Sequence, residues 1–198
     1  MSQSTAPAVH LAARALADAI NTGIPYAVVG GAACSLLGSH RTTSDVDVVV
    51  PTNTVASSRK LLKQAGTFLV DPRTCHTYHS LTGVEIELVT QWFQNQFNES
   101  TPTLTVNGVR ILHPVLILDA KCRSVFARSS DAKKISDAFD IAFLLEYCAK
   151  NRIIIKKGHV TEDGAGCLPA IEFLISERNI PRRLWNTVGY IDNVGWSQ

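Results

Sequence analysis

Hydrophobic positions in the first half of the chain fall into short runs and periodic segments, which predicts a mixture of strands and helices. The apolar run Tyr26–Val29 is too short for a helix and predicts a buried strand. In Asp45–Val50, acids alternate with valines and Pro51 follows, which predicts a second strand with two different faces. Apolar residues at helical spacing predict helices over Ala8–Ile20, Ala32–Leu37 and Val55–Ala65.

Turn residues between further alternating segments predict two β-hairpins. Thr82-Gly83 separates Thr74–Leu81 from Val84–Thr90. Asn107-Gly108 separates Thr103–Val106 from Val109–Leu112, and Asn-Gly between such segments is the strongest short hairpin signal. Thr67–Val70 is a further short strand.

From Val115 onward the apolar spacing becomes helical, and it predicts helices over Val115–Ser129, Ala132–Lys150 and Leu168–Arg178. Ile153–Ile155 is either a short strand or a buried linker. The predicted fold class is therefore α+β. We expect a small mixed β-sheet flanked by helices over residues 1–114, and a helical C-terminal lobe over residues 115–198.

The composition is that of a globular protein, with 45% hydrophobic and 18% charged residues. Since no run of about eighteen uncharged apolar residues occurs, no membrane span is expected. Met1–Ile20 has no basic region ahead of an apolar run, so we expect no signal peptide. The five cysteines include no Cys-x-x-Cys pair, which favours a reducing, cytoplasmic setting over a disulfide framework or a zinc site.

The charge is modest overall but uneven. The net charge is +2, whereas residues 121–157 carry nine basic and four acidic side chains. A local basic stretch suits a polyphosphate ligand or a short piece of RNA, or it is simply a solvated face. Extended DNA binding is not expected, because such a footprint makes a whole domain strongly basic.

The alternating strands place acids together. Side chains two apart in a strand share a face, so Asp45 and Asp47 project to the same side. Glu85 and Glu87 repeat the pattern, and either of them becomes a third carboxylate if the two strands are neighbours. A cluster of carboxylate oxygens suits Mg²⁺, and three carboxylates can hold two Mg²⁺ ions.

Gly30-Gly31 follows a predicted strand and precedes a predicted helix. Without a Cβ, the backbone N–H groups of such a turn can approach phosphate oxygens closely. A glycine pair alone is usually only a tight turn. Its spacing to Arg41, Thr43 and the Asp45-x-Asp47 motif makes the combination far more specific.

With these motifs the chain resembles the DNA polymerase β-like nucleotidyltransferase superfamily. The resemblance rests on Val28–Ala33 and on Arg41–Asp47, and it is strongest to the small stand-alone type that includes minimal and abortive-infection toxin nucleotidyltransferases. It continues as far as Leu145, through basic and acidic positions that these proteins also carry on two later helices. Those positions are Lys121, Arg128, Lys133, Asp137 and Asp140.

The resemblance implies a nucleotidyltransferase that uses a metal-bound NTP and releases pyrophosphate. It implies that Asp45, Asp47 and Glu87 are the catalytic and metal-binding residues, with Glu87 a better third carboxylate than Glu85, and that two Mg²⁺ ions are bound. Nucleotide binding is expected of Gly30, Gly31, Arg41, Ser44 and Lys121. For Arg41 and Lys121 the alternative is an ordinary ion pair.

Two other functions stay open. A catalytically silent protein of the same fold would act as a nucleotide- or partner-binding module. A metal-dependent glycosyltransferase would also use Asp-x-Asp, but it gives no reason for Gly30-Gly31 at this spacing. The acceptor, whether a small molecule, tRNA or a protein, is not encoded in these motifs. A zinc site at His76 and His79 is rejected, because residues three apart in a strand face opposite sides.

Overall fold

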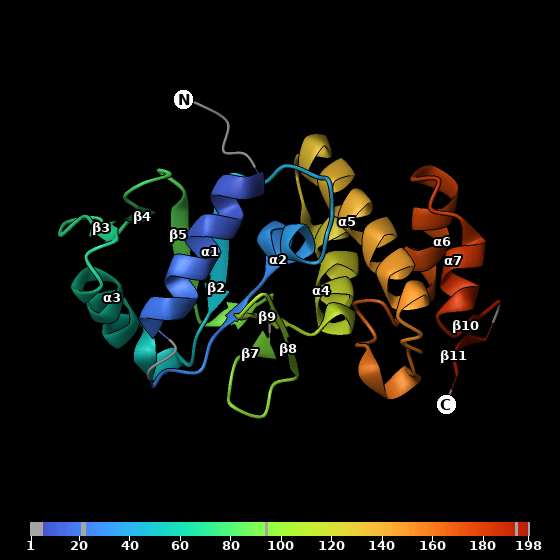
Figure 1. Cartoon of the computed structure of the whole chain (residues 1–198). Coiled ribbons are helices and arrows are strands. Elements are labelled where there is room, and N and C mark those ends of the chain that lie inside the picture. The colour runs from blue at the N-terminus through green and yellow to red at the C-terminus, as the bar shows by residue number, and fades with distance from the viewer. Residues whose placement is uncertain (1–5, 21–22, 94, 193, 198) are drawn as a thin grey trace. The chain divides into compact units, whose positions relative to one another are not determined.

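The computed structural model describes residues 6–20, 23–93, 95–192 and 194–197. The chain divides into two compact units, Met1–Leu112 and His113–Gln198 (Figure 1). The expected domains 1–114 and 115–198 stay a prediction, because compactness alone does not show that either unit folds by itself. Among the described helices, none is long and apolar enough to cross a bilayer.

In the first unit, the described residues form one seven-stranded mixed sheet with the strand order β3-β4-β5-β2-β1-β9-β8. Strands β1 and β9 are parallel, as are β2 and β5, while the other neighbours are antiparallel. The strands are β1 (Ala27–Val28), β2 (Asp45–Val49), β3 (Phe68–Val70), β4 (Thr77–His79), β5 (Glu85–Val89), β8 (Thr103–Val106) and β9 (Val109–Leu112). The predicted mixed sheet and both predicted hairpins are confirmed. A separate ribbon of β6 (Gln91–Trp92) and β7 (Asn95–Gln96) was not predicted.

Three α-helices accompany this sheet: α1 (Ala6–Ile20), α2 (Gly30–Leu36) and α3 (Val55–Gln64), the last preceded by a 3₁₀ turn, η1 (Thr52–Thr54). Helices α1 and α2 pack on the sheet at β2. The three predicted helices are confirmed with one correction. Gly30 and Gly31 do not precede α2 but form its first two residues, and α2 is only seven residues long.

Alternation along β2 and β5 separates two faces of the sheet. Val46 and Val48 are fully buried, whereas Asp45 and Asp47 are only half-buried. On β5, Ile86 and Leu88 are likewise buried, whereas Glu85 is half-buried and Glu87 is exposed. We call the side that carries Asp45, Asp47, Glu85 and Glu87 the carboxylate face.

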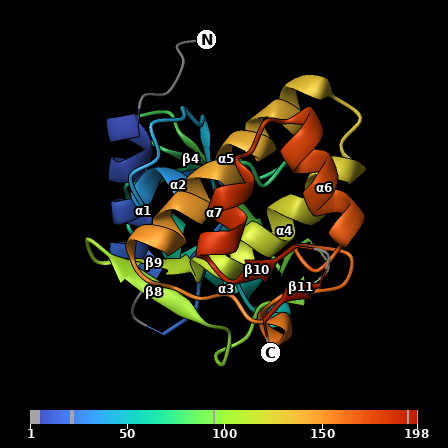
Figure 2. The same cartoon turned by 90° about the vertical axis from the view of Figure 1, so that its right-hand side faces the viewer.

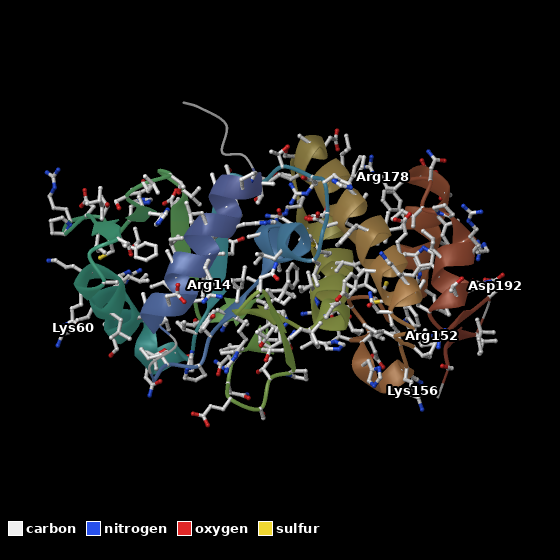
Figure 3. All side chains as sticks on the ribbon, viewed as in Figure 1. Arg14, Lys60, Arg152, Lys156, Arg178 and Asp192 are labelled. Atoms are coloured by element: carbon white, nitrogen blue, oxygen red, sulfur yellow. The ribbon has the colours of Figure 1, made fainter. Side chains whose placement is uncertain are left out.

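Arg14, which is labelled on α1 in Figure 3, contacts the turn between β8 and β9 at one edge of the sheet. Its Nη1 donates a hydrogen bond to the carbonyl of Asn107 at 2.8 Å, and its guanidinium lies against Gly108. Asn107 and Gly108 both have positive φ angles, 49° and 78°, as a two-residue hairpin turn of this kind requires. The turn predicted from Asn-Gly is thus held by a residue more than ninety positions away.

The second unit is mainly helical in its described part (Figure 2). Its helices are α4 (Pro114–Ala127), α5 (Asp131–Lys150), α6 (Leu168–Glu177) and α7 (Arg182–Thr187), with a 3₁₀ turn, η2 (Lys157–His159). Ile153–Ile155 is a linker rather than a strand, and Ile155 is fully buried. The short antiparallel pair β10 (Tyr190–Ile191) and β11 (Gly195–Trp196) was not predicted.

Three aromatic residues near the C-terminus form part of the core of this second unit. Trp185, Tyr190 and Trp196 are all buried, and their ring centroids lie 5.6 to 6.3 Å apart. Trp196 Nε1 also donates to the carbonyl of Ala165 at 2.6 Å. Because these rings are buried against one another inside the unit, they do not offer a stacking surface to RNA.

Buried Asp119 on α4 anchors the loop that leads to α6. It accepts hydrogen bonds from the backbone N–H groups of Thr161 and Ala165 and from the Thr161 hydroxyl, all within 2.9 Å. The loop passes so close to Asp119 that a Cβ at Gly164 would collide with the carboxylate. This glycine therefore has a packing role.

Candidate functional site

The carboxylate face is built by the parallel pairing of β2 with β5. Asp45 lies directly opposite Glu85, and Asp47 directly opposite Glu87. Neighbouring strands are separated by about 4.8 Å, so each pair of acids is close enough to share a cation. The strand alternation that places two acids on one side of each strand, together with this register, brings four acids to one side of the sheet.

Asp47 is held close to the glycine pair. A Cβ at Gly30 would lie 2.8 Å from Asp47 Oδ2, and Gly30 has a φ of +63°. The backbone joins the same two segments, because the N–H of Val29 donates to the carbonyl of Asp47 at 2.9 Å. Gly30 is required here for two reasons: the left-handed backbone disfavours other residues, and the carboxylate occupies the space of a side chain.

Gly31 faces a different pair of side chains. A Cβ at this position would collide with Nη2 of Arg41 and would lie 3.0 Å from Oγ1 of Thr43. The guanidinium and the hydroxyl thus lie over the bare Cα of Gly31. The two glycines bring the acidic strand and the segment before it together at one place, the first turn of α2.

Thr43 orients Asp45, and sequence reasoning did not assign it a role. Its hydroxyl donates to Asp45 Oδ1 at 2.9 Å, so one carboxylate oxygen is held while the other stays available. The sequence did contain a signal for this contact, because residues two apart in an extended segment, such as 43 and 45, point to the same side. Ser44, a predicted nucleotide-binding residue, is exposed between them.

The two acids of β5 differ in their surroundings. Glu85 is paired with His76, whose ring also stacks on Tyr78 with centroids 6.1 Å apart. Glu87 is exposed and lies across from Asp47. His79 belongs to the opposite face: it is buried, packs on Phe68 and bonds Thr82 Oγ1 at 2.8 Å. His79 therefore does not border the acids.

Lys121 lies in the second unit, in a buried ion-pair network between α4 and α5. Its Nζ is 2.7 Å from Asp137 Oδ1 and 2.8 Å from Asp140 Oδ2. Burial lowers the pKa of Lys121, but the carboxylates of Asp140 and Asp137 outweigh this effect and leave it above its usual value. Lys121 is thus a protonated partner of two acids, and its contact with a nucleotide stays a prediction.

Asp137 is the centre of that network. Besides Lys121, it accepts hydrogen bonds from Ser124 Oγ at 2.9 Å and from Arg128 Nε at 3.3 Å. Burial raises the pKa of Asp137, but the positive charge of Lys121 and these donors together bring it below its usual value. Because all these charges are matched, the network joins the two helices without an unpaired buried carboxylate.

The carboxylate face has the donor chemistry that Mg²⁺ takes, namely hard oxygens. Within the described residues, no three acidic, histidine or cysteine side chains converge into a ready ligand cluster. Mg²⁺ does not need one, since it usually binds through one or two carboxylates and completes its shell with waters and substrate phosphates. Asp45 and Asp47, with Glu87 opposite, fit that mode.

Comparison with known proteins finds likeness at the level of the fold. No protein-family model and no curated protein sequence matches the chain. Among solved structures, an antigenic nucleotidyltransferase-like protein from Paracoccidioides brasiliensis aligns with a TM-score of 0.66 and 23% identity, over 93% of each chain. The protein JHP933 from Helicobacter pylori aligns with a TM-score of 0.57 and 18% identity, over 92% of this chain and 87% of the other.

These likenesses define the class of fold. The chain has the nucleotidyltransferase fold, a mixed sheet flanked by helices and followed by a helical region. The fold expected from the motifs at Gly30-Gly31 and Asp45-Val46-Asp47 is therefore confirmed.

Proposed function

We propose that this protein is a Mg²⁺-dependent nucleotidyltransferase that moves an NMP from an NTP to an acceptor hydroxyl. The observation that carries the proposal is the β2–β5 register, which sets Asp45 and Asp47 opposite Glu85 and Glu87 on one face. The contacts of Gly30 with Asp47 and of Gly31 with Arg41 support it. A nucleotide phosphate and a metal would meet where these segments adjoin.

Each residue has a distinct part in this proposal. Arg41 would bind phosphate oxygens beside Gly31, where the absence of a Cβ leaves the guanidinium room. Asp45, oriented by Thr43, and Asp47, next to Gly30, would hold the metal. Ser44 lies exposed between these groups and would donate to a phosphate.

Mg²⁺ bound here would neutralise the charge of the triphosphate and lower the pKa of the acceptor hydroxyl, and two ions are expected. The protein's own contribution is to place those ions and to align the reactants. A bond forms between the acceptor oxygen and the α-phosphorus, while the bond from the α-phosphorus to the bridging oxygen breaks. Pyrophosphate leaves, and Glu87 takes the proton of the hydroxyl.

Glu87 is the better third carboxylate because Glu85 is already engaged. The His76 ring pairs with Glu85, whereas Glu87 lies exposed opposite Asp47. Glu87 therefore keeps its oxygens for the metal or the acceptor. This assignment is tested separately from the overall reaction.

The alternative is a catalytically silent binding module of the same fold. Such a module would bind nucleotide and would keep its role when the acids are neutralised. The enzyme, in contrast, depends on the negative charge of Asp47.

The test is a transfer assay with α-labelled NTPs. Purified protein is incubated with Mg²⁺ and separate pools of tRNA, protein and small hydroxyl compounds, and label transfer and pyrophosphate are measured. We expect Mg²⁺-dependent transfer in one pool, abolished by Asp47→Asn and kept by Glu99→Gln, which changes an exposed acid outside the site. If Mg²⁺-dependent nucleotide binding persists unchanged in Asp47→Asn and no pool is labelled, the protein is a nucleotide-binding module and not a transferase.

A further inference from the structure

A continuous row of side chains extends from the carboxylates to the edge of the sheet. Strand register places Asp45 opposite Glu85, Glu85 opposite Tyr78, and Tyr78 opposite Leu69. All four therefore project to the carboxylate face. With strands about 4.8 Å apart, Tyr78 lies two strands from Asp45, within the span of one small molecule.

The outer part of this row is apolar and accessible. Leu69 is 63% exposed and Tyr78 is 37% exposed. On the opposite face, their strand neighbours Phe68 and His79 are buried against each other. The first unit thus leaves a tyrosine ring and a leucine open to solvent next to the acids of the carboxylate face.

His76 extends the aromatic surface and keeps it next to the acids. Its ring is nearly parallel to that of Tyr78, at an interplanar angle of 15°, and it pairs with Glu85. Two rings and one aliphatic side chain therefore form a platform, which we define as His76, Tyr78 and Leu69. The pairing with Glu85 joins the platform directly to the carboxylate row.

The position of the platform indicates which reactant it faces. Gly31 and Arg41, the proposed phosphate contacts, lie on the α2 side of Asp47. Glu87 lies on the other side, on β5, and β4 with Tyr78 follows it in the sheet. If phosphates occupy the first side, the attacking hydroxyl approaches from the second.

We propose that His76, Tyr78 and Leu69 form the acceptor subsite, where a planar ring of nucleobase size stacks on Tyr78 while its neighbouring hydroxyl reaches Glu87. This inference rests on the proposed function for its orientation. Aromatic side chains bind bases through their faces, and an adjoining aliphatic group covers the ring edge. A free nucleoside and the end of an RNA strand both present this chemistry.

The experiment compares ring binding in the wild type, Tyr78→Phe and Tyr78→Leu. The donor site is first saturated with α,β-methylene-ATP and Mg²⁺, and binding of adenosine is then measured by saturation-transfer NMR. A fluorescent RNA hexamer, followed by polarisation, forms the second arm. Tyr78→Leu keeps an apolar strand residue, so loss of folding does not confuse the result. Tyr147→Leu, which alters a tyrosine of α5 in the second unit, is the matched control.

We expect Tyr78→Leu to weaken ring binding about tenfold, the scale of one base stack. Tyr78→Phe and Tyr147→Leu should stay close to the wild type, and the affinity for α,β-methylene-ATP should be unchanged in all. If Tyr78→Leu weakens binding of adenosine alone, the bound ring belongs to a free nucleoside. If it weakens binding of the hexamer alone, the ring belongs to an RNA strand. Unchanged ring binding in Tyr78→Leu overturns the proposal, and so does a loss that affects only the ATP analogue.

Failure of the proposed function would look different. In that case the wild type would show no Mg²⁺-dependent binding of α,β-methylene-ATP. Adenosine and RNA binding would then be measured without the analogue. A loss in Tyr78→Leu would still show a ring-binding surface, although no longer one that serves a transfer reaction.

Discussion

The carboxylate of Asp47 occupies the space beside Gly30, where a Cβ at position 30 would lie 2.8 Å from Asp47 Oδ2. The glycine also has a φ of +63°, which other residues adopt only at a cost. The close approach of the Asp47 carboxylate to Gly30 thus joins the glycine motif to the acidic motif. It explains why the two occur together in the sequence, beyond any role of the glycine in approaching phosphate.

This contact predicts the effect of Gly30→Ala. The new Cβ would push the Asp47 carboxylate out of place and strain the backbone. We expect the free energy of unfolding to fall by about 1–2 kcal/mol and transfer activity to fall by about a hundredfold. Urea denaturation and the α-labelled NTP assay measure the two effects. Gly158→Ala is the control, since nothing lies within 4 Å of a Cβ there; equal effects at both positions would refute the explanation.

Neutralising Asp47 should separate catalysis from folding. Asp47→Asn keeps the size of the side chain and removes the charge that the metal requires. We expect transfer to fall by at least about a hundredfold, with little change in melting temperature. Added Mg²⁺ should shift the melting temperature of the wild type in the presence of NTP but not that of the variant. Retained turnover would exclude Asp47 as a metal ligand.

Comparison of Glu87→Gln with Glu85→Gln tests the third carboxylate. Because His76 engages Glu85, we expect Glu87→Gln to reduce turnover far more than Glu85→Gln, by about ten- to a hundredfold. The readout is kcat at saturating NTP and Mg²⁺. The reverse order would show that Glu85 leaves His76 to serve the reaction.

Lys121→Met should destabilise the protein, because it removes the positive charge that pairs with both buried carboxylates, Asp137 and Asp140. Loss of one member of a buried ion pair costs about 3–5 kcal/mol. Lys133→Met, at an exposed position of α5, should have almost no effect on thermal unfolding. If Lys121→Met keeps its stability and instead loses NTP affinity, the phosphate contact predicted from the sequence is its main role.

His113 predicts a loss of stability in acid. Its Nδ1 accepts a hydrogen bond from the Val115 N–H at the start of α4, and only the unprotonated nitrogen can do so. Burial, with a smaller effect from the charge of His159, lowers the pKa of His113. The unfolded state therefore binds more protons, so stability is complete above about pH 6.5 and is lost as the pH falls through the folded-state pKa.

The measurement is thermal unfolding between neutral and mildly acidic pH. His113→Asn keeps an acceptor at this position but does not titrate, so its melting temperature should fall less than that of the wild type. In free energy of unfolding, the acid-induced loss in the wild type should exceed that in His113→Asn by about 1 kcal/mol, the contribution of one helix cap. Burial lowers the pKa of His79 as well, so His79 adds the same loss of stability in acid to the wild type and to the variant. Parallel pH profiles would show that His113 does not contribute.

Much of the fold was predictable because its signals are local. The hairpin at Asn107-Gly108 follows from backbone preferences of two residues, and the helices α1, α3, α4 and α5 follow from apolar spacing. The pair β10 and β11 was missed because each strand has only two residues, too few to show alternation. The start of α2 at Gly30 was missed because glycine has a low helix propensity. A glycine stands there because the Asp47 carboxylate occupies the space of a side chain.

For the candidate site, the sequence by itself determined which side chains share a face. The two-residue period of a strand sets Asp45 beside Asp47 and Glu85 beside Glu87, whatever the rest of the chain does. Only the tertiary structure decided that β2 and β5 are neighbours, that His76 pairs with Glu85, and that Lys121 lies between two acids. These contacts join segments distant in sequence, and they depend on the packing of the whole unit rather than on any local preference.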